Sequence, residues 1–199
     1  TPPNGPEPSF PDKKIYKAIW IWHTARQLKN PSAQKEFFKF CQKEGVNLVF
    51  FQLQYVLQKK KNGTYECLLK HESELRKFIS TATSYGIEVH ALDGFSRFAL
   101  KPWHEKVLAQ IQSIIDYNKK VSPREQFRGI HHDNEPYLIP SYWGTILEGV
   151  MVQYLDLCEK SQNKCANCIE LKSLDENSQE VVFFNKCNFP MWILLSDCL

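Results

Sequence analysis

The sequence has no apolar run that approaches the roughly 18 residues a membrane-spanning helix needs, and its net charge is only +3. Binding to membranes or to nucleic acid is therefore not predicted. Its 8 glycines and 11 prolines are too few and too scattered for a low-complexity polymer. It lacks a glycine-rich phosphate loop, a nucleophile elbow and a kinase signature. With 43% apolar and 24% charged residues, the 199-residue chain is typical of one globular domain, or one domain with an appendage.

Cysteines and one glycosylation motif bear on the cellular compartment. The seven cysteines are an odd number, so at least one thiol has no partner within the chain: Cys41, Cys67, Cys158, Cys165, Cys168, Cys187 and Cys198. Asn62-Gly63-Thr64 is an acceptor tripeptide for an N-linked glycan in a polar loop. Together these features favour the secretory route, with the cytoplasm as the alternative. Because the sequence starts with Thr rather than Met, we expect a processed product, a fragment or an incomplete gene model.

An alternation of strands and helices follows a proline-rich leader at residues 1–14. Short apolar runs predict four buried strands, at residues 15–22, 46–53, 87–92 and 127–133. Helical spacing and end signals predict helices at residues 32–44, 71–85, 103–119 and 141–160, and residues 58–64 are expected to form a basic loop. This order is typical of parallel strands joined by right-handed crossovers. A complete eight-unit barrel takes about 250 residues, so the four units predict an α/β fold that is half of a TIM-like (β/α)8 barrel.

The last 39 residues, 161–199, lack this rhythm and are expected to form an irregular, cysteine-rich tail. The tail would be a truncated or alternative C-terminus on a half-barrel domain of residues 15–160. The alternative is a complete, compact α/β domain with a cysteine-stapled tail. Cys165-x-x-Cys168 has no second closely spaced pair, which favours disulfides or free thiols over a zinc site.

Polar residues gather where the predicted strands end, and parallel α/β folds place their chemistry at those ends. The candidates are His23, Gln52, Gln54, Asp93, His131, His132, Asp133, Asn134, Glu135 and Tyr137. Strand alternation places His131, Asp133 and Glu135 on one face and His132 with Asn134 on the other. Asp133 and Glu135 thus form a carboxyl pair in which each group raises the pKa of the other. A carboxyl kept protonated in this way can donate a proton to a leaving oxygen, as glycosidic cleavage requires.

The segment FRGIHHDNEPY, residues 127–137, resembles the fourth-strand signature of glycosidase barrels. Gly129, Ile130, Asp133 and Glu135 match the spacing of family 18 chitinases, although Arg128 and His131 stand where that family has aspartates. Asn134-Glu135-Pro136 is similar to the acid/base motif of the clan A retaining glycosidases. Both resemblances imply that Glu135 is the proton donor. The chitinase-like version makes Asp133 the supporting carboxylate, whereas the clan A version needs a nucleophilic glutamate from a seventh strand that this chain does not reach.

The resemblance implies a carbohydrate substrate and no cofactor; the oligomeric state is not predicted. Substrate binding is expected from residues near the strand ends: His23, Gln52, Gln54, Asp93, His131, Asn134 and Tyr137. Two other functions stay open, namely an inactive carbohydrate-binding fragment and a metal-dependent barrel hydrolase. The chain lacks the His-x-His of such hydrolases at its first strand. In a purely structural reading, Asp133 caps the turn after the strand, Asn134 takes a left-handed conformation and Glu135 is a solvated loop acid.

Overall fold

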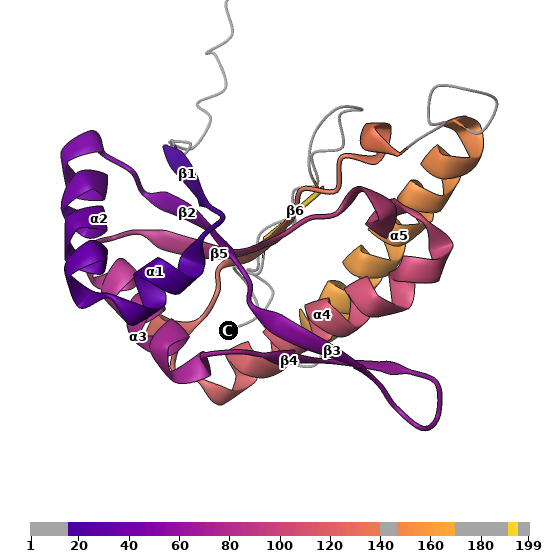
Figure 1. The fold of residues 1–199 in the computed structure, drawn as a ribbon, viewed down its shortest axis with the longest axis horizontal. Coiled ribbons are helices and arrows are strands. Elements are labelled where there is room, and N and C mark those ends of the chain that lie inside the picture. Colours follow the sequence, from indigo (N-terminus) through magenta and orange to yellow (C-terminus); the bar gives the residue numbers. More distant parts are fainter. Residues whose placement is uncertain (1–15, 140–146, 170–190, 195–199) are drawn as a thin grey trace, which may run out of the picture.

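The computed structural model describes residues 16–139, 147–169 and 191–194 (Figure 1). Four strands form a parallel sheet in the order β1 (Ala18–Ile21), β2 (Leu48–Gln52), β5 (Glu88–Asp93) and β6 (Gly129–His132). The predicted parallel pairing and strand order are therefore confirmed. A further strand, β7 (Met191–Leu194), pairs antiparallel with β6 and leaves β1 at the opposite edge of the sheet.

Helices cover one face of this sheet. They are α1 (Thr24–Lys29), α2 (Pro31–Glu44), α3 (Glu72–Ser84), α4 (Lys101–Lys120) and α5 (Leu147–Ile169), with short 3-10 turns η1 (Ser96–Ala99), η2 (Pro123–Glu125) and η3 (Pro136–Leu138). The main core lies between them and the strand residues Val49, Phe51, Val89, Ala91 and Ile130. We call this the helix face of the sheet. Among the described residues, no helix is long and apolar enough to span a membrane.

Local signals explain the boundaries of α2. The Asn30 side chain accepts a hydrogen bond from the Ala33 backbone N–H at 3.1 Å, and Pro31 occupies the first helical position. At the other end, Gly45 takes a left-handed conformation with φ 68° and ends the helix. The sequence carries these signals locally, so the expected helix at residues 32–44 is found within one residue.

A β-hairpin stands where a basic loop was expected. Strands β3 (Tyr55–Lys59) and β4 (Tyr65–Leu69) pair antiparallel, and β4 lies against α4 (Figure 1). Only residues 60–64 form the turn, closed by the Lys60 N–H to the Thr64 carbonyl at 2.8 Å. The expected loop at residues 58–64 is confirmed for residues 60–64, whereas Gln58 and Lys59 belong to β3. Both look like loop residues, but they are exposed on the hairpin, where polar side chains are tolerated. Helix α1 was not predicted.

The domain boundary expected at residue 160 falls inside a helix. Helix α5 continues through Ile169, so residues 161–169 are helical and not irregular. Tyr154, Leu157, Ser161 and Cys165 are buried at helical spacing, and this buried stripe explains why the helix continues. Cys41, Cys67 and Cys158 are free thiols. The leader at residues 1–14, the remainder of the expected tail apart from β7, and Cys187 and Cys198 lie outside the described residues.

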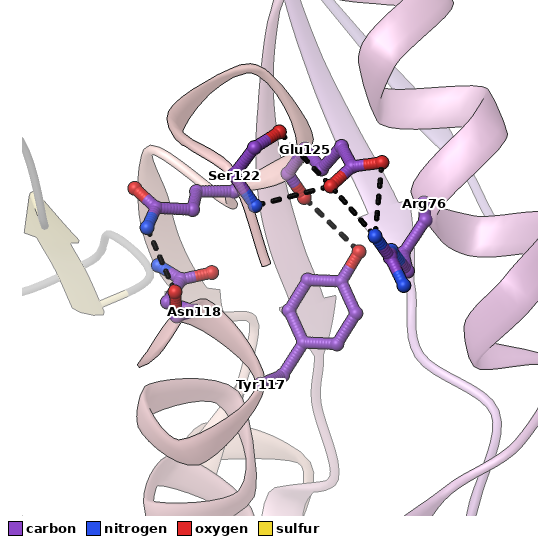
Figure 2. A network of polar contacts seen from close by, with 6 residues as sticks. Arg76, Tyr117, Asn118, Ser122 and Glu125 are labelled. Atoms are coloured by element: carbon purple, nitrogen blue, oxygen red, sulfur yellow. Dashed lines mark hydrogen bonds and ion pairs between the residues drawn. The ribbon is translucent and has the colours of Figure 1, made fainter. Parts of the chain in front are cut away.

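A polar network ties α3, α4 and η2 together just before β6 begins (Figure 2). The Arg76 guanidinium donates to the Glu125 carboxylate at 3.0 Å, and that carboxylate also accepts from the Ser122 N–H and hydroxyl. These donors lower the pKa of Glu125. Tyr117 donates its hydroxyl to the Glu125 carbonyl at 3.0 Å. The network fixes the segment that leads into the strand carrying the candidate site.

Asn118 completes this connection, and we predict that Asn118→Leu destabilises the fold. Its buried amide donates to the Phe127 carbonyl at 2.9 Å and accepts from the Phe127 N–H at 3.0 Å. Leucine can do neither, and each buried backbone group left without a partner costs about 1–3 kcal/mol. Chemical denaturation should show this loss, whereas Lys119→Leu, at the exposed neighbouring position, should change stability little. Equal stability of both variants would contradict a structural role for Asn118.

Candidate functional site

The candidate site lies where β5 and β6 end side by side. The Asp133 N–H donates to the Asp93 carbonyl at 2.8 Å, which extends the pairing of the two strands by one residue. Gly94 follows Asp93 and packs directly against the Asp133 backbone, so closely that a Cβ atom at position 94 would overlap the Asp133 carbonyl. Backbone contacts therefore hold the start of the Asp133–Glu135 segment.

Gly94→Ala is accordingly predicted to displace this segment. The added methyl group meets backbone rather than a movable side chain, and such overpacking typically costs about 1–3 kcal/mol. We expect a lower melting temperature and altered amide chemical shifts around Asp133. Gly149→Ala is the matched control, because a Cβ there, on an exposed helical residue, meets no atom and alanine favours the helix. A Gly94→Ala protein as stable as the control would contradict this packing.

Asp133 and Glu135 follow β6, which ends at His132, and they lie close enough for the charge of Glu135 to act on Asp133. Burial, and secondly the charge of Glu135, raise the pKa of Asp133. Glu135 is half-buried and has the left-handed backbone conformation, φ 42° and ψ 56°, that the structural reading assigned to Asn134. Its carboxylate accepts a hydrogen bond from the Tyr137 hydroxyl, a bond that raises the pKa of Tyr137. The pair thus sits in a constrained turn with one partly desolvated member.

The other polar residues at the strand ends divide between the two faces of the sheet. Asp93 points to the helix face, where Tyr55 donates to it at 2.5 Å, Gln110 donates to the same oxygen, and the Gly94 N–H donates at 2.8 Å. These three donors tie the hairpin and α4 to the sheet. Burial together with the Asp93 charge raises the pKa of Tyr55. The Asp93 carboxylate is therefore engaged in hydrogen bonds that stabilise the fold. The sequence analysis did not identify its partners Tyr55 and Gln110.

His131 lies on the opposite face, which we call the open face. There its ring lies 4.3 Å from that of Phe50 and 6.1 Å from that of Trp20, measured between centroids. His90 shares this face, and its ring fills the space that a Cβ of Gly129 would occupy. Burial lowers the pKa of His131 to about 3. The open face thus carries a cluster of rings two residues before Asp133.

His132 alternates with His131 and lies on the helix face, where its ring is 6.4 Å from that of Phe98, and both His132 and Asn134 are fully buried. Within the part of the chain that the structure describes, their side-chain nitrogen and oxygen atoms have no hydrogen-bond partner. Burial lowers the pKa of His132 to about 4, while the nearby Asp93 charge acts in the other direction. Both side chains are therefore shielded from solvent, whereas Asp133 and Glu135 are half-buried.

The ends of β1 and β2 carry the remaining candidates. The Thr24 hydroxyl donates to the Gln52 carbonyl at 3.0 Å and accepts from the Gln54 amide at 3.1 Å, so Gln54 helps to fix α1 to the sheet. The Gln52 side chain is half-buried and His23 is exposed. Asn62 lies in the exposed hairpin turn, where its side chain accepts from the Thr64 N–H and hydroxyl at 3.1 and 2.7 Å. The acceptor tripeptide is therefore presented on the surface.

Neither a group of metal-ligating residues nor a similar known protein identifies the site further. In the described ranges, no group of three or more His, Cys, Asp or Glu residues could hold a metal ion. Comparison with protein-family models, curated proteins and solved structures finds no match. The candidate site is therefore defined by its own residues.

Proposed function

We propose that this protein is a glycoside hydrolase-like enzyme in which Glu135 donates the proton to the leaving oxygen and Asp133 is the supporting carboxylate. The observation that carries this proposal is the carboxyl pair at the end of β6, whose member Asp133 has a raised pKa. Cleavage of a glycosidic bond requires a carboxyl group that gives a proton to the leaving oxygen and a second carboxylate that supports the reaction.

The shape of the sheet supports a half-barrel scaffold for this chemistry. Strands β1 and β6 are three positions apart, which corresponds to about 14 Å in a flat sheet. The rings of Trp20 and His131 nevertheless approach to 6.1 Å on the open face, and Phe50 lies between them. This approach is expected for a sheet that curves with the open face inside, as in a barrel.

Several polar residues remain available to a sugar in this proposal. His23 and Tyr137 are exposed, and Gln52 is half-buried, whereas Asp93 and Gln54 are held by structural hydrogen bonds. We assign sugar contacts to His23, Gln52 and Tyr137 first. A secretory location fits the exposed position of Asn62.

A second function, carbohydrate binding without catalysis, is favoured by one contact. The Tyr137 hydroxyl already occupies an oxygen of Glu135. That oxygen is therefore not free to approach a leaving group, which favours a side chain that takes part in binding only.

Hydrolysis of chromogenic aryl glycosides by the full chain tests the proposal. We expect release of the chromophore from at least one glycoside, with a rate that is unchanged by a chelator. Retention on a polysaccharide without release from any glycoside would support the binding-only function instead. Activity lost on chelation and restored by a divalent cation would favour a metal-dependent hydrolase and contradict the proposal.

A further inference from the structure

Three large aromatic side chains lie exposed along the edge strand of the sheet. Tyr16, Trp20 and Trp22 are 44%, 43% and 39% exposed, and they lie just before, within and just after β1. The Trp20 ring packs in a tilted arrangement against Phe50, with centroids 4.8 Å apart, and the Tyr16 hydroxyl donates to the Glu88 carboxylate at 3.2 Å. Both partners belong to the open face, and Trp22 lies in the bend that follows β1. We call these three residues the β1 aromatic stripe.

The composition of the stripe is unusual for an edge strand. Edge strands commonly carry charges or prolines that prevent unwanted association. Here three of the four exposed residues between positions 16 and 22 are flat rings, the fourth being Lys17, and the ring of Trp20 is held against Phe50. An exposed ring that already packs against a neighbour on one side can bind a flat apolar ligand on its other side. Such binding costs little side-chain conformational entropy.

We propose that the β1 aromatic stripe binds an oligosaccharide, with the rings stacked on the apolar C–H faces of successive sugar units. This inference rests on the proposed function and specifies its substrate as a chain of sugars. At about 3.3 Å per residue in a strand, Trp20 and Trp22 are about 7 Å apart and the stripe spans about 20 Å. A single sugar cannot cover this length, so several linked units are required.

The charges beside the stripe favour a neutral ligand. Lys17 donates to the Glu44 carbonyl, and the Glu88 carboxylate accepts from Tyr16. One cation and one anion therefore flank the rings, and both are engaged. A single-stranded nucleic acid also stacks on aromatic rings, but it needs a positively charged groove that these residues do not form.

The exposed area argues against a second protein chain as the occupant. A buried aromatic side chain covers about 150–250 Å², so three rings exposed by about two-fifths present roughly 250 Å² in all. A stable protein interface takes about 800 Å² from each partner.

The stripe also continues toward the carboxyl pair, because Trp20 lies 6.1 Å from His131, two residues before Asp133.

Binding of neutral hexasaccharides tests the proposal. The probes are chitohexaose, cellohexaose, xylohexaose and laminarihexaose, titrated into the full-length Glu135→Gln protein and followed by tryptophan fluorescence and calorimetry. We expect one of them to bind and its monosaccharide not to bind. Trp22→Ala and Tyr16→Ala should each weaken binding about tenfold, with the melting temperature measured to verify folding. Phe40→Ala, an equally exposed aromatic residue on α2, is the matched control and should bind as well as the parent.

The outcomes separate this inference from the proposed function. Hexasaccharide binding that depends on Trp22, in a protein that hydrolyses no glycoside, would support the stripe and overturn the proposed function. Hydrolysis of an aryl glycoside, together with hexasaccharide affinity that is unchanged in Trp22→Ala and Tyr16→Ala, would support the proposed function and overturn the stripe. Absence of binding by all four hexasaccharides would overturn the stripe, as would stripe-dependent binding of oligo-dT or stripe-dependent dimerisation in place of sugar binding.

Discussion

Glu135→Gln should lower the rate of glycoside hydrolysis by about 10²–10⁴-fold, because one missing general acid typically has an effect of this size. Glutamine keeps the shape of the side chain and can still accept the Tyr137 hydrogen bond, but its amide cannot deliver a proton. The loss should appear in kcat, since removing the proton donor affects the transition state more than the binding of substrate. Steady-state kinetics on a chromogenic glycoside would measure it.

Two controls make this result specific. Glu159→Gln, at an exposed position on α5, should leave kcat unchanged. The melting temperature of Glu135→Gln should stay near that of the parent, because the turn at residues 135–138 is preserved. Activity of Glu135→Gln near the wild-type rate would contradict the assignment of the acid, and an equal loss in Glu159→Gln would point to a general defect.

The folded protein should lose stability steeply as the pH falls below about 6.5. Burial lowers the pKa of His131 to about 3 and that of His132 to about 4, from 6.5 for an exposed histidine. The unfolded chain therefore binds more protons than the folded chain in the window between these values. The contribution of these histidines is fully present above pH 6.5 and is lost progressively toward pH 4 and below.

Each histidine changes the unfolding free energy by about 1.4 kcal/mol per pH unit within this window. We expect the two together to lower stability by about 2–4 kcal/mol between pH 7 and pH 5. Denaturant unfolding at several pH values would measure this slope. Asp133 acts in the opposite direction, because its raised pKa favours the folded state as the pH falls through that pKa toward 3.8, so it reduces the net slope at the acid end.

Variants without the titrating rings provide the comparison. His131→Phe places an apolar ring beside Phe50 and Trp20, and His132→Gln removes the other titrating group. Each should reduce the slope by about half, even if its stability at pH 7 differs from that of the parent. A wild-type profile that is flat between pH 7 and pH 5, or variants with the full slope, would contradict the role of these histidines.

The regular elements could largely be predicted from local patterns. The apolar runs around Val49, Val89 and Ile130 formed the expected parallel strands, because strands buried under helices need continuous apolar sequence. The end of α2 at Gly45 was equally local. The hairpin was missed because its pairing depends on packing against α4, which lies far along the chain. The full length of α5 was missed because Cys165 looked like part of a cysteine cluster, although it is a buried helical residue.

Local pattern is enough to place His131 and His132 on opposite faces of β6, because alternation is a property of a single strand. Local pattern also predicts that polar groups meet at the ends of parallel strands. What each group does there depends on the tertiary structure. Asp93 is held by donors from the hairpin and α4, His131 lies within a cluster of rings, and Trp20 remains exposed at the edge of the sheet. These differences arise because burial and hydrogen-bond partners come from segments distant in the sequence, and no local pattern records them.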